Sequence, residues 1–481
     1  MDILITATEA EGFIKTGGLG DFISGLAVAL SQNNVGVKVV LPNYKNLNSN
    51  NFEKIASFDI TNPDDFNPVN PVLIENFKDK IRCDVLHSKL YGADFYFIDN
   101  DYYFNRENIY GYDDDYLRFA FFSRAIKELI ELKNWETQIV HINDYHEGVL
   151  PLILNNSNSE SLKNLKTLLS IHNLYFQGYF EFSSELDYDL FNYYLGFKWE
   201  SKSSINFLKE AITYSDKIIT VSPSYAENIK TKKFGNGLDE LLREKSVCGF
   251  INGINMDLYP RNSDFESFLK EKSVIKHKIQ NKFGLKEDLN TPLLIVIGRV
   301  GIQKGSHLIL EILKDLISEN QLILLGTGVP EIEEKFKKLN EEYSNFVGII
   351  DFDESLAKEL YMGGDIFLMP SCFEPCGISQ LIAMHYANIP IVYNTGGLKD
   401  TIIYSKDYEK NNGFKFYDYD AKEFLKICNE ALNIFNTDKW TKIMKNAYKT
   451  NYSWENQAKN YIKLYNTVIK ERDEKWINYI L

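Results

Sequence analysis

Three glycines near the start of the chain lie between a lysine and an aspartate in the stretch KTGGLGD: Lys15, Gly17, Gly18, Gly20 and Asp21. Glycines let backbone N–H groups approach a ligand, and a helix that begins near Asp21 would direct its positive end toward an anion. A P-loop has its lysine after the glycines, and a dinucleotide fingerprint has a third glycine where isoleucine stands here. The stretch therefore predicts an anion site of another kind. The alternative is a tight turn without a ligand, and Lys15 favours the anion.

Two cations follow an apolar stretch in the second half of the chain, in VIGRVGIQKG. Arg299 and Lys304 would share the loop after a strand, and ligands of open α/β sheets bind where strands end. Two cations at that place could clamp a diphosphate and neutralise its charge as it leaves. The alternative is a pair of solvated surface charges.

A single carboxylate follows another apolar stretch, in FLMPSCFEPCGISQ. Glu374, with Cys376 and Gly377 after it, could accept sugar hydroxyl groups or stabilise positive charge at an anomeric carbon. The alternative is an acid that stabilises the N-terminus of a helix. A second glycine turn could hold anionic oxygens on its backbone. This turn comprises Thr395, Gly396 and Gly397.

Short, continuous apolar stretches alternate with helical patterns along the chain. Examples are DILITA, TQIVHIN and LKTLLSIHN in the first half, and PLLIVIGR, QLILLGTG, DIFLMPS and IPIVYNT in the second. Buried parallel strands that alternate with helices indicate a doubly wound α/β architecture. The pattern restarts near residue 292, and 481 residues exceed a single ordinary core. We therefore predict two Rossmann-like domains, residues 1–255 and 256–454.

Two amphipathic helices are predicted from their apolar spacing. The stretch DFISGLAVALSQ places Phe22, Leu26 and Leu30 on one face. A long helix is expected over about residues 455–481, with Ser453 as its N-cap. Its buried stripe would comprise Trp454, Ala458, Tyr461, Leu464, Tyr465 and Val468.

Composition and charge exclude several classes of protein. The formal net charge is -14, which argues against nucleic-acid binding, and any anionic ligand needs a local cationic cluster. The five cysteines are few and mostly far apart, which fits a reducing compartment. The N-terminus does not resemble a signal peptide, and no stretch of 18 apolar residues predicts a membrane span. We expect a cytoplasmic protein.

Taken together, the motifs resemble those of bacterial glycogen synthases and plant starch synthases. KTGGLGD is the family's N-terminal signature, and it is followed in the family's order by HINDYHEG, IHNLYFQG, INGIN, GRVGIQKG, LGTG, DIFLMPSCFEPCGISQ, TGGLKDT and YSWE. Three further matches, in the same order along the chain, are YFIDNDYYFNRENIYGYDDDYLRFAFFSRAIKEL, INFLKEAITYSDKIITVSPSYAENI and GNGLDELLRE. Each match is weak alone, but a dozen collinear matches over nearly the whole chain are very specific.

The resemblance implies the GT-B fold, in which two Rossmann-like domains enclose a deep cleft and the C-terminal helix returns to the first domain. It implies a retaining glycosyltransferase that moves glucose from ADP-glucose to the non-reducing end of an α-1,4-glucan and releases ADP. No cofactor and no metal is implied. The alternative is another retaining GT-B enzyme that uses UDP-glucose and a different acceptor.

The resemblance also implies a role for each motif residue. Lys15 and the glycine turn would lie beside the phosphates and the transferred glucose, and Asp21 would help to bind the donor. Arg299 and Lys304 would bind the diphosphate. Residues implied to border the glucose are Asp144, His172, Glu374 and Cys376, with Gly377 beside them. The resemblance further implies that Asn252 lies near the cleft and that Phe352 covers the adenine. It also implies that the backbone of Thr395, Gly396 and Gly397 contacts phosphate and sugar.

Several positions depart from the family's pattern. Phe352 stands where a tyrosine is common; it could stack on a base but cannot donate a hydrogen bond. Cys372, Tyr393 and Asn394 replace residues that are often basic, so the second domain is less positive. Many UDP-sugar enzymes of this fold carry a second glutamate eight residues after the first, and here that position is Ile382. This difference favours ADP-glucose.

The expected reaction separates charge between an oxocarbenium-like sugar and a departing diphosphate. Retention would ordinarily suggest a carboxylate nucleophile. Because the resemblance places Glu374 at the sugar hydroxyls, we expect a front-face route in which the leaving phosphate oxygen takes the acceptor's proton. His172 would orient and stabilise through its imidazole or its backbone carbonyl. The YDDDY stretch at 112–116 is interpreted as a surface or acceptor-side loop, with metal binding as the alternative.

Overall fold

The computed structural model describes residues 1–47, 52–61 and 81–480, with side chains as far as Lys470. The chain divides into two compact units. The first unit comprises Met1–Val221, Ala226–Gly253 and the residues from Trp454 onward. The second comprises Ser222–Tyr225 and Ile254–Ser453. The predicted end of the last helix, Leu481, lies outside the described residues.

The first unit is built on a mixed sheet of nine described strands, ordered β11-β10-β7-β6-β1-β2-β5-β4-β3. Seven neighbouring strands are parallel, from β11 through β5, whereas β4 and β3 form an antiparallel edge. The strands are β1 (Asp2–Thr6), β2 (Gly36–Pro42), β3 (Glu53–Asp59), β4 (Arg82–Leu90), β5 (Ala93–Asp99), β6 (Ile139–Asn143), β7 (Lys166–Ile171), β10 (Lys217–Thr220) and β11 (Val247–Gly249).

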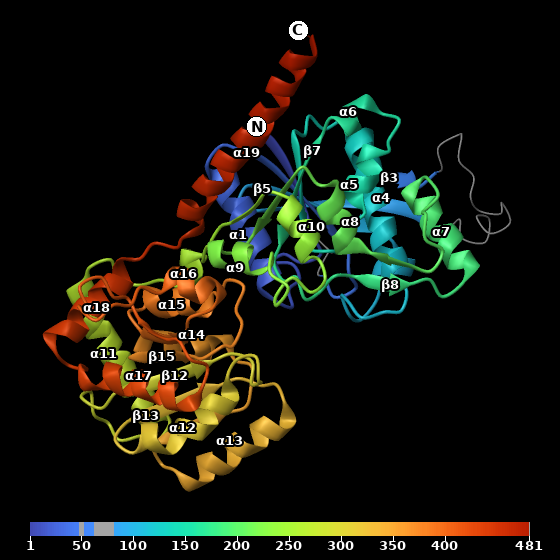
Figure 1. The fold of residues 1–481 in the computed structure, drawn as a ribbon. Coiled ribbons are helices and arrows are strands. Elements are labelled where there is room, and N and C mark those ends of the chain that lie inside the picture. The colour runs from blue at the N-terminus through green and yellow to red at the C-terminus, as the bar shows by residue number, and fades with distance from the viewer. Residues whose placement is uncertain (48–51, 62–80, 481) are drawn as a thin grey trace. The chain divides into compact units, whose positions relative to one another are not determined.

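Helices flank this sheet, and a short antiparallel pair lies apart from it (Figure 1). The helices are α1 (Gly18–Gln32), α3 (Asp101–Phe104), α4 (Asp115–Lys133), α5 (Leu150–Asn155), α6 (Glu160–Lys163), α7 (Glu185–Leu195), α8 (Phe207–Tyr214), α10 (Asp239–Glu244) and α19 (Trp454–Ile480). The separate strands are β8 (Tyr179–Glu181) and β9 (Ser204–Asn206). Helix α9 (Pro223–Asn228) begins in the second unit and ends in the first.

The second unit has a fully parallel sheet of six described strands, ordered β14-β13-β12-β15-β16-β17. The strands are β12 (Leu293–Ile297), β13 (Gln321–Leu325), β14 (Phe346–Ile349), β15 (Ile366–Met369), β16 (Ile389–Tyr393) and β17 (Phe414–Phe416). The helices are η1 (Met256–Leu258), α11 (Phe265–Lys282), α12 (Ser306–Ile317), α13 (Pro330–Glu342), α14 (Glu354–Gly363), α15 (Ser379–His385), α16 (Gly396–Thr401), α17 (Ala421–Asn433) and α18 (Asp438–Lys449).

Both sheets have the strand order of a Rossmann-like fold, and the predicted doubly wound architecture is confirmed. The chain reverses its direction of travel across the sheet between β1 and β6 in the first unit, and between β12 and β15 in the second. Ligands of open α/β sheets bind beyond the carboxyl ends of strands at such switch points. These two places are therefore the expected positions of functional loops.

The C-terminal helix packs on the first unit, where red α19 runs beside blue α1 (Figure 1). Its predicted stripe is buried except at Leu464, which is half-buried because it lies at the edge of the apolar face. Trp454 begins this helix between two glycines. An added Cβ would lie 1.9 Å from the Trp454 Nε1 atom at Gly25 and 2.5 Å from its ring at Gly253. Only glycine leaves room for the indole at both positions.

Candidate functional site

The loop after β1 carries Lys15 and leads into the glycine turn. The Lys15 Nζ atom lies 2.7 Å from Glu11 Oε2 and 2.9 Å from Asp21 Oδ1. Partial burial lowers the pKa of this ammonium, but the hydrogen bonds and charges of Glu11 and Asp21 outweigh that effect and raise the pKa overall. Lys15 therefore stays charged, and an anionic ligand would have to compete with two carboxylates for it.

The glycine turn opens helix α1, whose first N–H groups have no partner within the helix. At Gly20 an added Cβ would lie 3.1 Å from the Lys15 side chain and 3.3 Å from the Glu11 backbone nitrogen. Glycine at this position therefore lets the Lys15 loop lie against the helix. Gly17 differs, because nothing lies within 4 Å of an added Cβ. The turn also presents the positive end of the helix dipole to any ligand placed there.

Asp144 follows β6 and holds the loop after β7. Its backbone is left-handed, with φ of 57°, which is uncommon for a residue other than glycine. Its Oδ1 atom accepts the N–H groups of His172 at 2.7 Å and Asn173 at 3.4 Å. Burial raises the pKa of Asp144 to about 7, against the effect of those two N–H groups and with a small contribution from Glu9.

The imidazole of His172 is held in one tautomer by its neighbour Asn143. The Asn143 Nδ2 atom donates to the carbonyl oxygens of Thr6 at 3.0 Å and His141 at 3.3 Å, so its Oδ1 atom accepts from His172 Nε2 at 3.0 Å. Burial lowers the pKa of His172 to about 3, so the ring is neutral at neutral pH. Its Nε2–H is used internally and cannot serve as an acid toward a substrate.

The ring of Phe22 connects the glycine turn with His172. Phe22 lies on α1, and its ring centroid is 4.4 Å from that of His172 in an edge-on contact. Trp454 contacts the same phenyl ring at 5.4 Å. The structure therefore brings together, at the carboxyl ends of β1, β6 and β7, the predicted residues Lys15, Gly17, Gly18, Gly20, Asp21, Asp144 and His172.

In the second unit, the loops after β12 and β15 bind each other. The Cys372 N–H donates to the Gln303 carbonyl at 2.9 Å, and Gln303 Nε2 donates to the Phe373 carbonyl at 3.3 Å. An added Cβ at Gly305 would lie 2.1 Å from the Pro370 carbonyl oxygen, so glycine permits this close approach. The backbone of the two loops thus fixes the place of the side chains between them.

Lys304 and Glu374 form an ion pair across these loops. The Lys304 Nζ atom lies 2.7 Å from Glu374 Oε2, and Glu374 is buried. Arg299, on the same loop as Lys304, is exposed. The arrangement offers a cation to an anionic ligand at the position where β12 and β15 diverge, with a carboxylate oxygen beside it.

The second glycine turn packs against the Glu374 loop. An added Cβ would lie 2.0 Å from the Glu374 carbonyl oxygen at Gly396 and 2.2 Å from that of Cys376 at Gly397. The Gly397 N–H donates to the carbonyls of Glu374 at 3.1 Å and Pro375 at 3.2 Å. This N–H is therefore engaged within the protein. The glycines following Thr395 are explained by close packing of two backbones.

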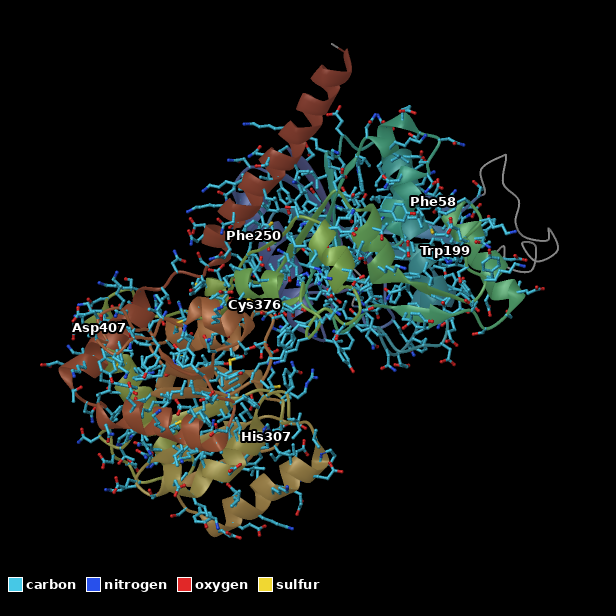
Figure 2. The ribbon with its side chains drawn as sticks, in the orientation of Figure 1. Phe58, Trp199, Phe250, His307, Cys376 and Asp407 are labelled. Atoms are coloured by element: carbon cyan, nitrogen blue, oxygen red, sulfur yellow. The ribbon has the colours of Figure 1, made fainter. Side chains whose placement is uncertain are left out.

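The remaining predicted residues are placed as follows. Cys376 is buried beside α15, where Figure 2 labels it, and Gly377 has φ of 75°. Phe352 is 77% exposed, at the end of the loop after β14. Asn252 is buried in the first unit, directly before the chain passes to the second.

The acidic YDDDY stretch pairs largely with arginines. Asp114 accepts a bidentate hydrogen bond from Arg106, at 2.5 and 2.6 Å, and Asp115 pairs with buried Arg118. Among the residues whose side chains the structure describes, 1–47, 52–61 and 81–470, no group of three His, Cys, Asp or Glu could hold a metal ion. No helix in that described part of the chain is long and apolar enough to cross a membrane.

Two family models match most of this chain. Residues 2–244 match the starch synthase catalytic domain, and residues 277–450 match glycosyl transferases group 1. The chain is 40% identical to the glycogen synthase of Clostridium kluyveri, over 98% of this chain and 100% of that protein. The chain belongs to the glycogen and starch synthase family. It is a glycosyltransferase.

Other members of the glycogen and starch synthase family agree with this assignment. The glycogen synthase of Lactobacillus acidophilus is 36% identical over 98% of this chain and 100% of that protein. The catalytic domain of starch synthase IV from Arabidopsis thaliana, solved with ADP and acarbose, superposes with a TM-score of 0.81. It is 27% identical and covers 98% of this chain and 99% of its own. The predicted fold of two Rossmann-like α/β domains, as in GT-B glycosyltransferases, is thereby confirmed.

Two residues that organise the first unit's loops were missed by sequence reasoning. Asn143 fixes the tautomer of His172, and Glu9 binds the glycine turn. The position of Asn143 could have been recognised from the sequence. An amide at the last position of a buried strand needs hydrogen-bond partners for both of its polar atoms. Glu9 gave no comparable local signal, since its partners are seven or more residues away.

Proposed function

We propose that this chain is a glycogen synthase that transfers glucose from ADP-glucose, with retention, to the non-reducing end of an α-1,4-glucan and releases ADP. The observation that carries the proposal is the Lys304–Glu374 pair, at 2.7 Å, in a chain similar over its full length to glycogen synthases. A lysine beside a buried carboxylate at a switch point offers one group for a diphosphate and one for a sugar.

The proposed function assigns donor-binding groups within each unit. In the first unit, Lys15 and the N-terminal N–H groups of α1 offer positive charge to phosphate oxygens. In the second unit, Arg299 and Lys304 bind the diphosphate. Lys304 leaves Glu374 for the phosphate, which frees the carboxylate to accept sugar hydroxyls. Phe352, whose ring is exposed, stacks on the adenine.

In the proposed reaction, the leaving phosphate oxygen takes the proton of the acceptor hydroxyl on the same face of the sugar. His172 is neutral and its Nε2–H is bound to Asn143. Its contribution is therefore electrostatic, through the backbone carbonyl, as positive charge develops on the sugar. Asp144 positions that carbonyl, because it accepts the N–H groups of His172 and Asn173, and the Asn173 N–H lies in the same peptide unit as the His172 carbonyl.

A donor panel tests the proposal. Purified protein is mixed with glycogen and ADP-glucose or UDP-glucose, and nucleotide release and glucan growth are measured. ADP-glucose should be preferred, since Ile382 is apolar and buried where a ribose-binding glutamate would stand in many UDP-sugar enzymes. Lys304→Ala and Glu374→Ala should each abolish release. Preference for UDP-glucose would assign the alternative donor, and wild-type inactivity with both donors would contradict the proposal.

A further inference from the structure

A buried carboxylate, Glu9, lies directly behind the glycine turn. It is 3% exposed and follows β1. Its oxygens accept four hydrogen bonds: from the Thr16 N–H at 2.5 Å, the Thr16 hydroxyl at 2.9 Å, the Gly17 N–H at 3.0 Å and the Tyr110 hydroxyl at 2.7 Å. The turn thus has an acceptor built into the loop that follows β1.

The two oxygens of Glu9 have different tasks. Oε2 accepts both backbone N–H groups, whereas Oε1 accepts both hydroxyls. A backbone N–H can only donate, so the place of Oε2 requires an acceptor. The two hydroxyl groups that contact Oε1 can either donate or accept a hydrogen bond. A donor group at the position of Oε1 would therefore also satisfy them. The turn therefore depends on one oxygen atom more than on negative charge.

Tyr110 extends the contact from the glycine turn toward Asp144. Its hydroxyl also bonds to Thr8 Oγ1 at 2.8 Å. Its ring stacks on His146 with centroids 4.7 Å apart and planes 21° apart. His146 stands two residues after Asp144, which holds the His172 backbone. Through Tyr110, the Glu9 carboxylate thus links the loop after β1 with the loop after β6, and both of these loops carry predicted site residues.

We propose that Glu9 is a positioning residue for the donor. Its Oε2 atom holds Thr16 and Gly17 so that Lys15 and the N-terminus of α1 are preformed for the diphosphate. The N–H groups of Thr16 and Gly17 do not bind phosphate, since Glu9 takes them, and the turn's contribution begins at Gly18. This inference rests on the proposed function, because it assigns the turn to a nucleotide-sugar donor.

The test compares two replacements of nearly equal size. Glu9→Gln keeps an oxygen for the two N–H groups, and the hydroxyls of Thr16 and Tyr110 can turn to accept from the amide. Glu9→Met removes every acceptor. We expect Glu9→Gln to bind ADP within about threefold of the wild type, and Glu9→Met to bind it about tenfold more weakly or worse. Calorimetric titration with ADP and the KM for ADP-glucose report this difference.

Hydrogen exchange gives a readout that needs no donor. The backbone amides of Thr16 and Gly17 should exchange slowly in the wild type and in Glu9→Gln, and at least about tenfold faster in Glu9→Met. If Glu9→Met does not fold, Glu9→Asp takes its place, because its carboxylate is one methylene too short to reach the turn. The same weakening of ADP binding is expected from it.

Asp216 supplies the matched control. Its carboxylate accepts the Thr167 N–H at 2.9 Å and the Thr167 hydroxyl at 3.1 Å, but at the amino end of β7, away from the candidate site. Asp216→Leu should lower thermal stability without changing ADP affinity. The proposal is overturned if Glu9→Met binds ADP as the wild type does, if Asp216→Leu weakens binding equally, or if Glu9→Gln is as defective as Glu9→Met. If the wild type does not bind ADP although the amides of Thr16 and Gly17 exchange slowly, the proposed function is contradicted. The hydrogen bonds of Glu9 to the turn would still be supported by that slow exchange.

Discussion

The Lys304 Nζ atom lies 2.7 Å from Oε2 of Glu374, although 70 positions separate the two residues in sequence. The pair unites the loops after β12 and β15, which are neighbouring strands. In the proposed reaction these two groups part, because the lysine turns to a phosphate and the carboxylate to a sugar. Each partner therefore holds the other in place until the donor arrives.

A double-mutant cycle measures this exchange of partners. Lys304→Met should lower kcat/KM for ADP-glucose by a factor corresponding to about 3–4 kcal/mol, as for the loss of other donors to a developing anion. Glu374→Gln should also lower it, and the double variant should lose less than the sum, with a coupling of about 0.5–3 kcal/mol. Purely additive losses would show that the two residues act independently.

Asp144 should make stability depend on pH. Its pKa is about 7 in the folded chain, above the ordinary aspartate value of 3.8. Between those values the folded state holds a proton that the unfolded state has released, so this group's stabilising contribution is lost as pH rises from about 4 to 7. Asp144→Asn keeps an oxygen for the His172 N–H and removes the titration.

Denaturant unfolding at several pH values checks the Asp144 prediction. The difference in unfolding free energy, wild type minus Asp144→Asn, should fall as pH rises, with a slope of at most about 1.4 kcal/mol per pH unit. A difference that does not change between pH 4 and 7 would contradict the raised pKa.

Gly25 should not tolerate a methyl group. In the middle of helix α1, alanine would gain roughly 0.8–1.0 kcal/mol of helix propensity over glycine. Here the added Cβ would lie 1.9 Å from Trp454 Nε1, so we expect Gly25→Ala to destabilise the protein by about 1–3 kcal/mol instead. Gly17→Ala, with open space around its Cβ, serves as the control for thermal stability. A higher melting temperature in Gly25→Ala would refute the packing argument.

Lys272 should be essential to the second unit. The buried amino group of Lys272, on α11, lies within hydrogen-bonding distance of four acceptors: the carbonyls of Met362, Gly364 and Tyr386 and the side chain of Asn388. Lys272→Met would leave these neutral buried acceptors without their donor, and we expect a loss of about 1–3 kcal/mol in the free energy of unfolding. Lys270→Met, on the same helix but in an exposed position, should change the unfolding free energy little. Equal effects of the two variants would contradict this role.

The sequence allowed the two sheets to be predicted because buried parallel strands are short, continuous apolar stretches such as β6 and β12. The antiparallel edge formed by β3 and β4 was not predicted, because its strands mix polar with apolar residues and lack the continuous apolar stretches by which the other strands were found. The motif residues were located by resemblance. Their pairing was not, because the bonds from Glu374 to Lys304 and from Glu9 to Thr16 depend on how separate loops meet in space.

The indole of Trp454 between Gly25 and Gly253 has a consequence for the way this protein is made. The ribosome synthesises α1 first and Trp454 more than 400 residues later. The first unit therefore cannot complete its fold until α19 has been synthesised. Until then the face of α1 that carries Phe22 and Gly25 has no cover from α19, whereas Ile254–Ser453 has already been completed. Domains generally fold as they emerge, in N-terminal order, but here the second unit can finish first. Chains released before the final helix would expose that face and be targets for chaperones and proteases.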